Sequence, residues 1–177
     1  MYHLTEAYLM AGLICLTAAY LGALLFGTGA VAPLMVRTLG EEGAAPLLRA
    51  YWPRFHGFAV GTGTLIMLSV AVGSIYSAVP MLYSLLVVLL CALMTACFLL
   101  GWRLIPAINE ARVAGANATF ARLHRLDVVL VGLGMLLALL VIAALVYVLP
   151  GQFTFWPTAP APALGPAPVT PPIMGPV

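Results

Sequence analysis

Residues 126–149 read LDVVLVGLGMLLALLVIAALVYVL, and after Asp127 this stretch holds no charged residue. A helix needs about 20 mostly apolar residues to cross the hydrocarbon core of a bilayer. Three further stretches meet this requirement, at residues 8–36, 56–79 and 81–104. None carries a charge in its central part, where a charge would cost at least about 2.5–3.5 kcal/mol. The sequence therefore predicts an all-α fold, an integral membrane four-helix bundle.

The composition supports this class. The chain has 177 residues, of which 64% are hydrophobic and 7% charged, whereas a soluble domain carries about 25% charged residues. Lipid must therefore cover part of the surface. We expect residues 1–150 to form a four-span transmembrane domain and residues 151–177 to form a Pro/Ala-rich extended tail. The net charge of +2 is small, and the arginines are divided between two segments, so the sequence does not predict nucleic-acid binding.

The charges predict the orientation. All seven cationic residues are arginines, and all lie within residues 37–54 and 103–125. Because positive residues favour the cytoplasmic side, both connections are expected there. The N- and C-termini are then expected on the outer, periplasmic face of a bacterial inner membrane. Residues 113–123 place Val113, Ala116 and Phe120 at helical spacing, which predicts an amphipathic connection lying on the membrane surface.

The C-terminal stretch has its own composition. Residues 151–177 contain eight prolines and no charge, which favours extended, polyproline-like conformations. Phe153, Phe155 and Trp156 are expected to form an aromatic anchor at the outer interface. Together with Pro157 they form the predicted partner-binding segment, because a proline-rich strand loses little entropy when it docks.

Two histidines are candidate ligands. His56 and His124 each lie near the cytoplasmic start of a span, and two imidazoles from two helices can hold a haem b iron or another metal. The alternative is that both bind water, backbone or headgroups. Asp127 shares a helical face with His124 and either orients that imidazole or pairs with an arginine such as Arg54 or Arg103. No dedicated metal site is predicted.

Charged side chains of the cytoplasmic connections are expected to pair with one another. The predicted network consists of Arg54, Arg103, Glu110, Arg112, Arg122, Arg125 and Asp127. Gly57 and Gly61 form a small-xxx-small motif, which predicts a close approach between two helices.

Two regions resemble a known family. Residues 26–33 (FGTGAVAP), followed by Arg37 and the run YWPRFH at 51–56, are similar to the first half of the TMEM205-like (DUF4149) domain family. Residues 105–112 and the run FARLHR at 120–125 are similar to its second half. The resemblance implies a small four-span membrane protein and no defined catalytic residues.

No nucleophile elbow, phosphate loop, metalloprotease helix or CxxC motif occurs, so we do not predict an enzyme. The sequence favours a non-catalytic accessory subunit of a larger membrane complex, with its C-terminal tail docked on a partner. A small redox protein that binds haem b or a metal through His56 and His124 is the alternative, and a transporter or permeability factor for a small solute is a second one. Bound lipid and other membrane subunits are the expected partners.

Overall fold

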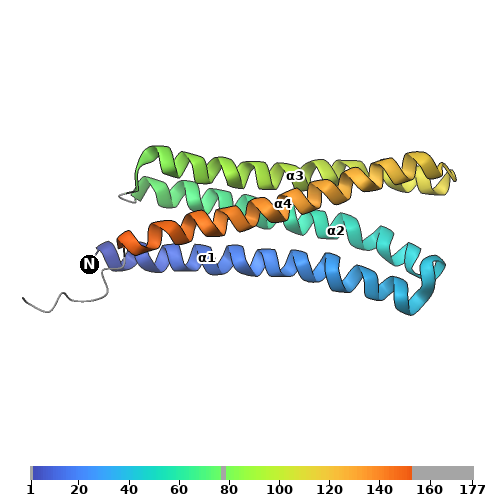
Figure 1. Ribbon diagram of the computed structural model, residues 1–177, viewed down its shortest axis with the longest axis horizontal. Coiled ribbons are helices and arrows are strands. Elements are labelled where there is room, and N and C mark those ends of the chain that lie inside the picture. Colours follow the sequence, from blue (N-terminus) through green and yellow to red (C-terminus); the bar gives the residue numbers. More distant parts are fainter. Residues whose placement is uncertain (1, 77–78, 153–177) are drawn as a thin grey trace, which may run out of the picture.

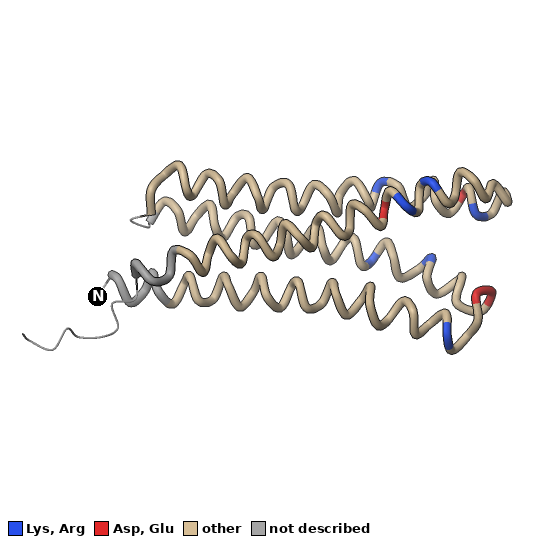
Figure 2. Tube along the Cα trace, in the orientation of Figure 1, with Lys and Arg blue, Asp and Glu red and all other residues tan. Residues whose placement is uncertain are grey.

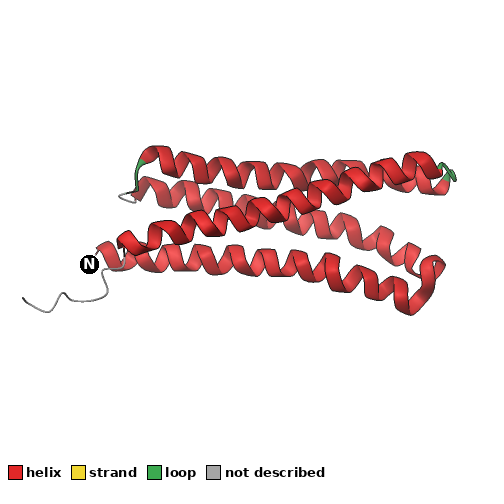
Figure 3. Ribbon diagram, viewed as in Figure 1, coloured by secondary structure: helices red, strands yellow, loops and turns green. Residues whose placement is uncertain are grey.

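The computed structural model describes residues 2–76 and 79–152, and within these ranges the fold is all-helical, without strands (Figure 3). Helix α1 (Tyr2–Phe26) continues through a π-helical segment, η1 (Gly27–Val31), into helix α2 (Ala32–Tyr76). Helices α3 (Met81–Val113) and α4 (Asn117–Gln152) follow. The predicted all-α class is confirmed, and residues 153–177, including the predicted partner-binding segment, lie outside the described residues.

Three helical stretches are long and apolar enough to cross a membrane. They are Tyr8–Ile75 with 68 residues, Met81–Val113 with 33 and Asn117–Tyr147 with 31. Several helices of this kind in one chain are the mark of a multi-pass membrane protein. The outward surface agrees, since large leucines such as Leu68, Leu136 and Leu139 remain about half exposed, at 53%, 53% and 52%.

The first stretch reverses direction at Gly40. This residue has φ 68° and ψ 171°, a backbone conformation reached essentially only by glycine. In Figure 1 the blue-to-cyan part of the ribbon turns sharply here, and the rest of α2 runs back along the molecule beside α1. The stretch from α1 to the end of α2 is therefore a helical hairpin, and Gly40 is the residue that allows the turn.

Helices α3 and α4 are joined by a tight turn. Gly115 has φ 67° and donates its N–H to the carbonyl of Arg112, while the N–H of Ala116 reaches the carbonyl of Ala111. This pair of bonds is the Schellman motif, which satisfies the last carbonyls of a helix. Helix α4 then starts at once at Asn117. The expected separate surface helix is replaced by the last turn of α3 and the first turns of α4.

The charged residues gather at one end of the molecule. Among residues 8–75 and 79–147, Figure 2 shows the arginines and acids toward the end where α1 passes into α2 and α3 turns into α4. Helix α1 begins, and α4 ends, at the opposite end (Figure 1). The two arginine-rich segments lie at the same end of the bundle, because the helices run alternately up and down.

Aliphatic side chains, together with Tyr20, Phe55 and Phe98, fill the core. Tyr20, Phe98 and Met94 are fully buried, and the Tyr20 hydroxyl donates to the Ala59 carbonyl at 3.2 Å, which links α1 to α2. Tyr20 and Phe98 meet edge-on, with ring centroids 6.2 Å apart. Such a pair contributes about 0.5–1.5 kcal/mol beyond its buried area.

Close helix approach occurs at glycines other than those predicted. A Cβ at Gly57 would lie 3.6 Å from the Trp102 ring, an ordinary contact, and one at Gly61 would meet nothing within 4 Å. At Gly63 it would lie 2.8 Å from Thr95 Oγ1, and a Cβ at Gly134 would also be too close, to the Phe98 ring. The tight packing is therefore set by which residue faces a neighbouring helix, which a spacing motif alone does not specify.

Candidate functional site

A buried ion pair joins α2 to α4. His56 Nε2 lies 3.1 Å from Asp127 Oδ1, across 71 residues of sequence, and the two side chains are 0% and 10% exposed. The other ring nitrogen, Nδ1, lies 3.0 Å from the carbonyl oxygen of Trp52. Both imidazole nitrogens of His56 are thus engaged within the protein.

These two bonds give each ring nitrogen a polar partner. The Trp52 carbonyl oxygen is the partner of Nδ1, and Asp127 Oδ1 is the partner of Nε2. This mutual pairing explains how a carboxyl group and an imidazole are tolerated together inside a helix bundle, where an isolated charge would be expensive.

The pair sits at the meeting point of three helices. Gly101 of α3 covers it so closely that a Cβ there would lie 2.7 Å from His56 Nε2 and 2.8 Å from Asp127 Oδ1. The rings of Phe55 and Phe98 stand edge-on to the imidazole, at centroid distances of 5.5 and 6.3 Å. These apolar groups pack against His56 and hold its ring in one orientation.

Gly101→Ala is expected to lower the free energy of unfolding by about 1–3 kcal/mol, the usual cost of overpacking. The added methyl group would push against both members of the pair, and neither is the free end of a flexible chain. Denaturant unfolding in detergent measures the change. Gly61→Ala is the matched control, because its methyl group enters open space and alanine favours helix. Equal stability of the two variants would contradict the packing described for Gly101.

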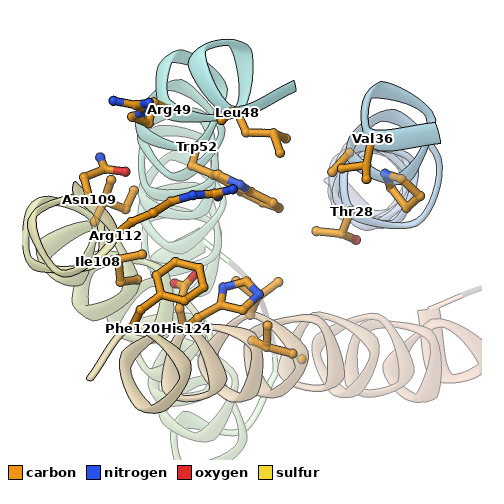
Figure 4. A pocket seen from close by; sticks show the side chains of 18 of the residues that line it. Thr28, Val36, Leu48, Arg49, Trp52, Ile108, Asn109, Arg112, Phe120 and His124 are labelled. Atoms are coloured by element: carbon orange, nitrogen blue, oxygen red, sulfur yellow. The ribbon is translucent and has the colours of Figure 1, made fainter. Parts of the chain in front are cut away.

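A cavity of about 700 Å³ lies beside this pair, at the charged end of the bundle. Residues of η1, α2, α3 and α4 line it, and Figure 4 shows Trp52 and Arg112 directed at a common space, whereas Arg49 extends away from it. Its walls are formed by Thr28, Ala32, Pro33, Val36, Arg37, Ala45, Leu48, Arg49, Trp52, Ile105, Ile108, Asn109, Arg112, Phe120, His124, Asp127, Val128, Val131, Gly132 and Met135. Its volume is in the range of small-molecule sites, about 300–1,000 Å³.

Two polar side chains mark the α3–α4 wall of the cavity. Arg112 extends from α3 into the space, and its guanidinium carbon lies 5.5 Å from the centre of the Phe120 ring (Figure 4). The imidazole ring of His124 stacks parallel to the Phe120 ring, with the two ring centroids 5.6 Å apart. Cation–π contact holds Arg112 in place without neutralising it, so its N–H groups stay available for an anion.

The π-helical turn lies against the same region. The N–H of Ala32 bonds to the carbonyl of Gly27, five residues back, which is the π pattern. Tyr51 and Phe55 pack so closely on Gly27 that no Cβ would fit there. Thr28, next in the chain, lines the cavity. Single π turns often occur at functional sites, and this one places α1 against the aromatic residues of α2.

The structure brings together some predicted residues and separates others. Asp127 binds His56, whereas the predicted partners were His124, Arg54 or Arg103. Among residues 8–75 and 79–147 no arginine forms an ion pair with a carboxylate, so the predicted network is not formed there. Arg54 instead donates to the Ala50 carbonyl at 2.7 Å. The remaining members, Arg103, Glu110, Arg122 and Arg125, are exposed on the surface.

The histidine pair predicted to hold haem b is arranged differently. His56 is fully buried and bonded at both nitrogens, while His124 is exposed, stacks on Phe120 and lines the cavity. Iron ligation by His56 would require it to give up one of these two bonds. Within the part of the chain whose side chains are described, no group of three or more His, Cys, Asp or Glu residues is placed to hold a metal ion.

Comparisons of the chain with protein-family models, with curated proteins and with solved structures find no match.

Proposed function

We propose that this protein is a non-enzymatic, multi-pass membrane protein that binds a small apolar or amphiphilic molecule in the cavity between its helices. The observation that carries this proposal is the cavity itself, about 700 Å³ in volume and lined by residues of η1, α2, α3 and α4. Side chains in a helix bundle normally fill the space between helices to the density of an organic crystal. An opening of this size beside a buried polar pair is therefore a site for a ligand.

The membrane arrangement is part of the same proposal. The hairpin at Gly40 divides the first helical stretch into two crossings, so the chain would cross a bacterial inner membrane four times. The arginine-bearing end would face the cytoplasm, as the positive-inside rule predicts, and the termini the outer face. This arrangement agrees with the four-span TMEM205-like (DUF4149) family that the sequence resembles.

The accessory role predicted from the sequence stands as a second proposal. The described surface supports it only in general terms, because exposed leucines suit lipid and a partner helix equally. Recovery of this chain alone from a mild-detergent pull-down would count against it. Ligand binding and subunit function are compatible, since many membrane subunits hold small molecules.

Native mass spectrometry of the protein, extracted from its own membrane, tests the ligand proposal. We expect one copy of a small molecule to remain bound per chain, because the cavity has the volume of a single small-molecule site. Organic extraction of the same sample then gives the mass of that molecule. A chain that is entirely ligand-free after mild extraction, and whose stability no amphiphile changes, would contradict the proposal.

A further inference from the structure

The two ends of the cavity differ in chemistry. At the charged end of the bundle it is lined by Arg37, Arg49 and Arg112, with Asn109 and His124 beside them. Toward the centre of the bundle it is lined mainly by aliphatic residues, among them Val131 and Met135. The cavity thus changes from cationic to apolar along its length.

The charge of the lining is strongly one-sided. The lining contains three arginines and a single acid, Asp127, whose carboxyl group is already engaged by His56. None of these three arginines forms an ion pair with a carboxylate in the part of the chain whose side chains are described. Arginine presents several N–H donors in a planar fork that fits carboxylate and phosphate oxygens. A cavity with this lining selects an anion.

The length and direction of the cavity match a membrane amphiphile. Along α4 the lining runs from Phe120 to Met135, which is about 22 Å at 1.5 Å per residue. Half of the hydrocarbon core of a bilayer is about 15 Å thick. A ligand with its head among the arginines would therefore lie at the level of the headgroups, with its chain directed toward the midplane.

From this arrangement we propose that the ligand is a single-chain amphiphile with an anionic head, a carboxylate or phosphate. The head is bound at the arginine-lined end, where Arg112 extends into the space, and the chain lies along α4 toward Gly132 and Met135. This inference rests on the proposed function, because it names the class of molecule that fills the cavity.

Two kinds of variant separate head recognition from chain recognition. Arg112→Gln removes a cationic donor at the head end. Gly132→Leu fills the chain end, since a Cβ at Gly132 meets nothing within 4 Å and a longer side chain extends into the cavity. Gly22→Leu is the matched control, because Gly22 is equally unobstructed but does not line the cavity.

The experiment measures binding to the full chain in nanodiscs of zwitterionic phosphatidylcholine. The probes are dodecyl phosphate, laurate, dodecanol, dodecyltrimethylammonium and inorganic phosphate alone. We expect dodecyl phosphate and laurate to bind at least about tenfold more tightly than the other three. Arg112→Gln should weaken the anionic probes about tenfold, Gly132→Leu should abolish their binding, and Gly22→Leu should leave it unchanged.

The outcomes distinguish the proposed ligand class, an anionic amphiphile, from the more general proposal that the cavity is a ligand site. If dodecanol or the cationic probe binds as tightly as the anionic ones, the anionic class is wrong while the cavity remains a ligand site. If inorganic phosphate binds as tightly as dodecyl phosphate, the chain contributes nothing and the amphiphile is wrong. If no probe binds, the proposed function fails together with this inference.

Discussion

Asp127→Ala is expected to lower the free energy of unfolding by roughly 3–5 kcal/mol, the range for removing one partner of a buried ion pair. His56 Nε2 would lose its only partner while the ring stays fully buried, and the Gly101 backbone leaves no room for the imidazole to turn away. Reversible unfolding in mixed detergent micelles measures the change. A loss near 0.6 kcal/mol, the average for a neutral cross-helix hydrogen bond in a membrane, would contradict a buried ion pair.

Asp127→Asn is the matched control for this prediction. The amide can donate an N–H to Nε2 while Nδ1 continues to donate to the Trp52 carbonyl, so we expect most of the stability to remain. His56→Ala combined with Asp127→Ala should cost clearly less than the two single changes added together, because each single change already breaks the same contact.

Leu139→Arg is expected to prevent correct insertion or to cost about 2.5–3.5 kcal/mol, the insertion penalty for an arginine at the centre of a spanning helix. Leu139 lies within α4 and is 52% exposed, so its side chain faces the surroundings of the bundle. The same substitution at an exposed position in a water-soluble protein usually changes stability by less than about 0.5 kcal/mol. Expression level in the membrane fraction and unfolding in detergent measure the effect.

Leu47→Arg provides the comparison. Leu47 is 48% exposed, nearly the same as Leu139, but it lies between Gly40 and Arg49 at the arginine-bearing end. We expect this variant to insert and fold like the parent chain, because an arginine there reaches the headgroups and water. Similar behaviour of the two variants would mean that lipid does not surround α4, and the proposed membrane crossing would be wrong.

The helices and the charged end were predictable because they depend on single-residue properties. Long uncharged stretches become helices in the structure, and arginine-rich segments separated by about 50 residues lie together because the intervening helices form an antiparallel pair. The boundaries were less predictable. Residues 37–55 are helical except at Gly40, and even include Pro46 and Pro53, whereas the arginines at 37–54 indicated a connection. Likewise α3 continues past Pro106 to Val113.

The pairing inside the bundle could not be read from spacing. His124 and Asp127 are three residues apart and do share the cavity-facing side of α4, as helical spacing predicts. The partner of Asp127, however, depends on how α2 and α4 are rotated about their own axes, and that rotation is set by packing against Gly101 and Phe98. One signal was present: His56 and Asp127 each begin an apolar stretch on the same side, and an acid at that depth needs a partner.

The contact between Gly101 and the His56–Asp127 pair also restricts how this chain can diverge. A larger residue at 101 is tolerated only if the side chains at 56 and 127 become smaller. Replacing His56 or Asp127 alone leaves the other side chain buried without its hydrogen-bond partner. In distant descendants of the same ancestor we therefore expect positions 56, 101 and 127 to be inherited as a unit, or replaced as one, while the neighbouring leucines vary freely.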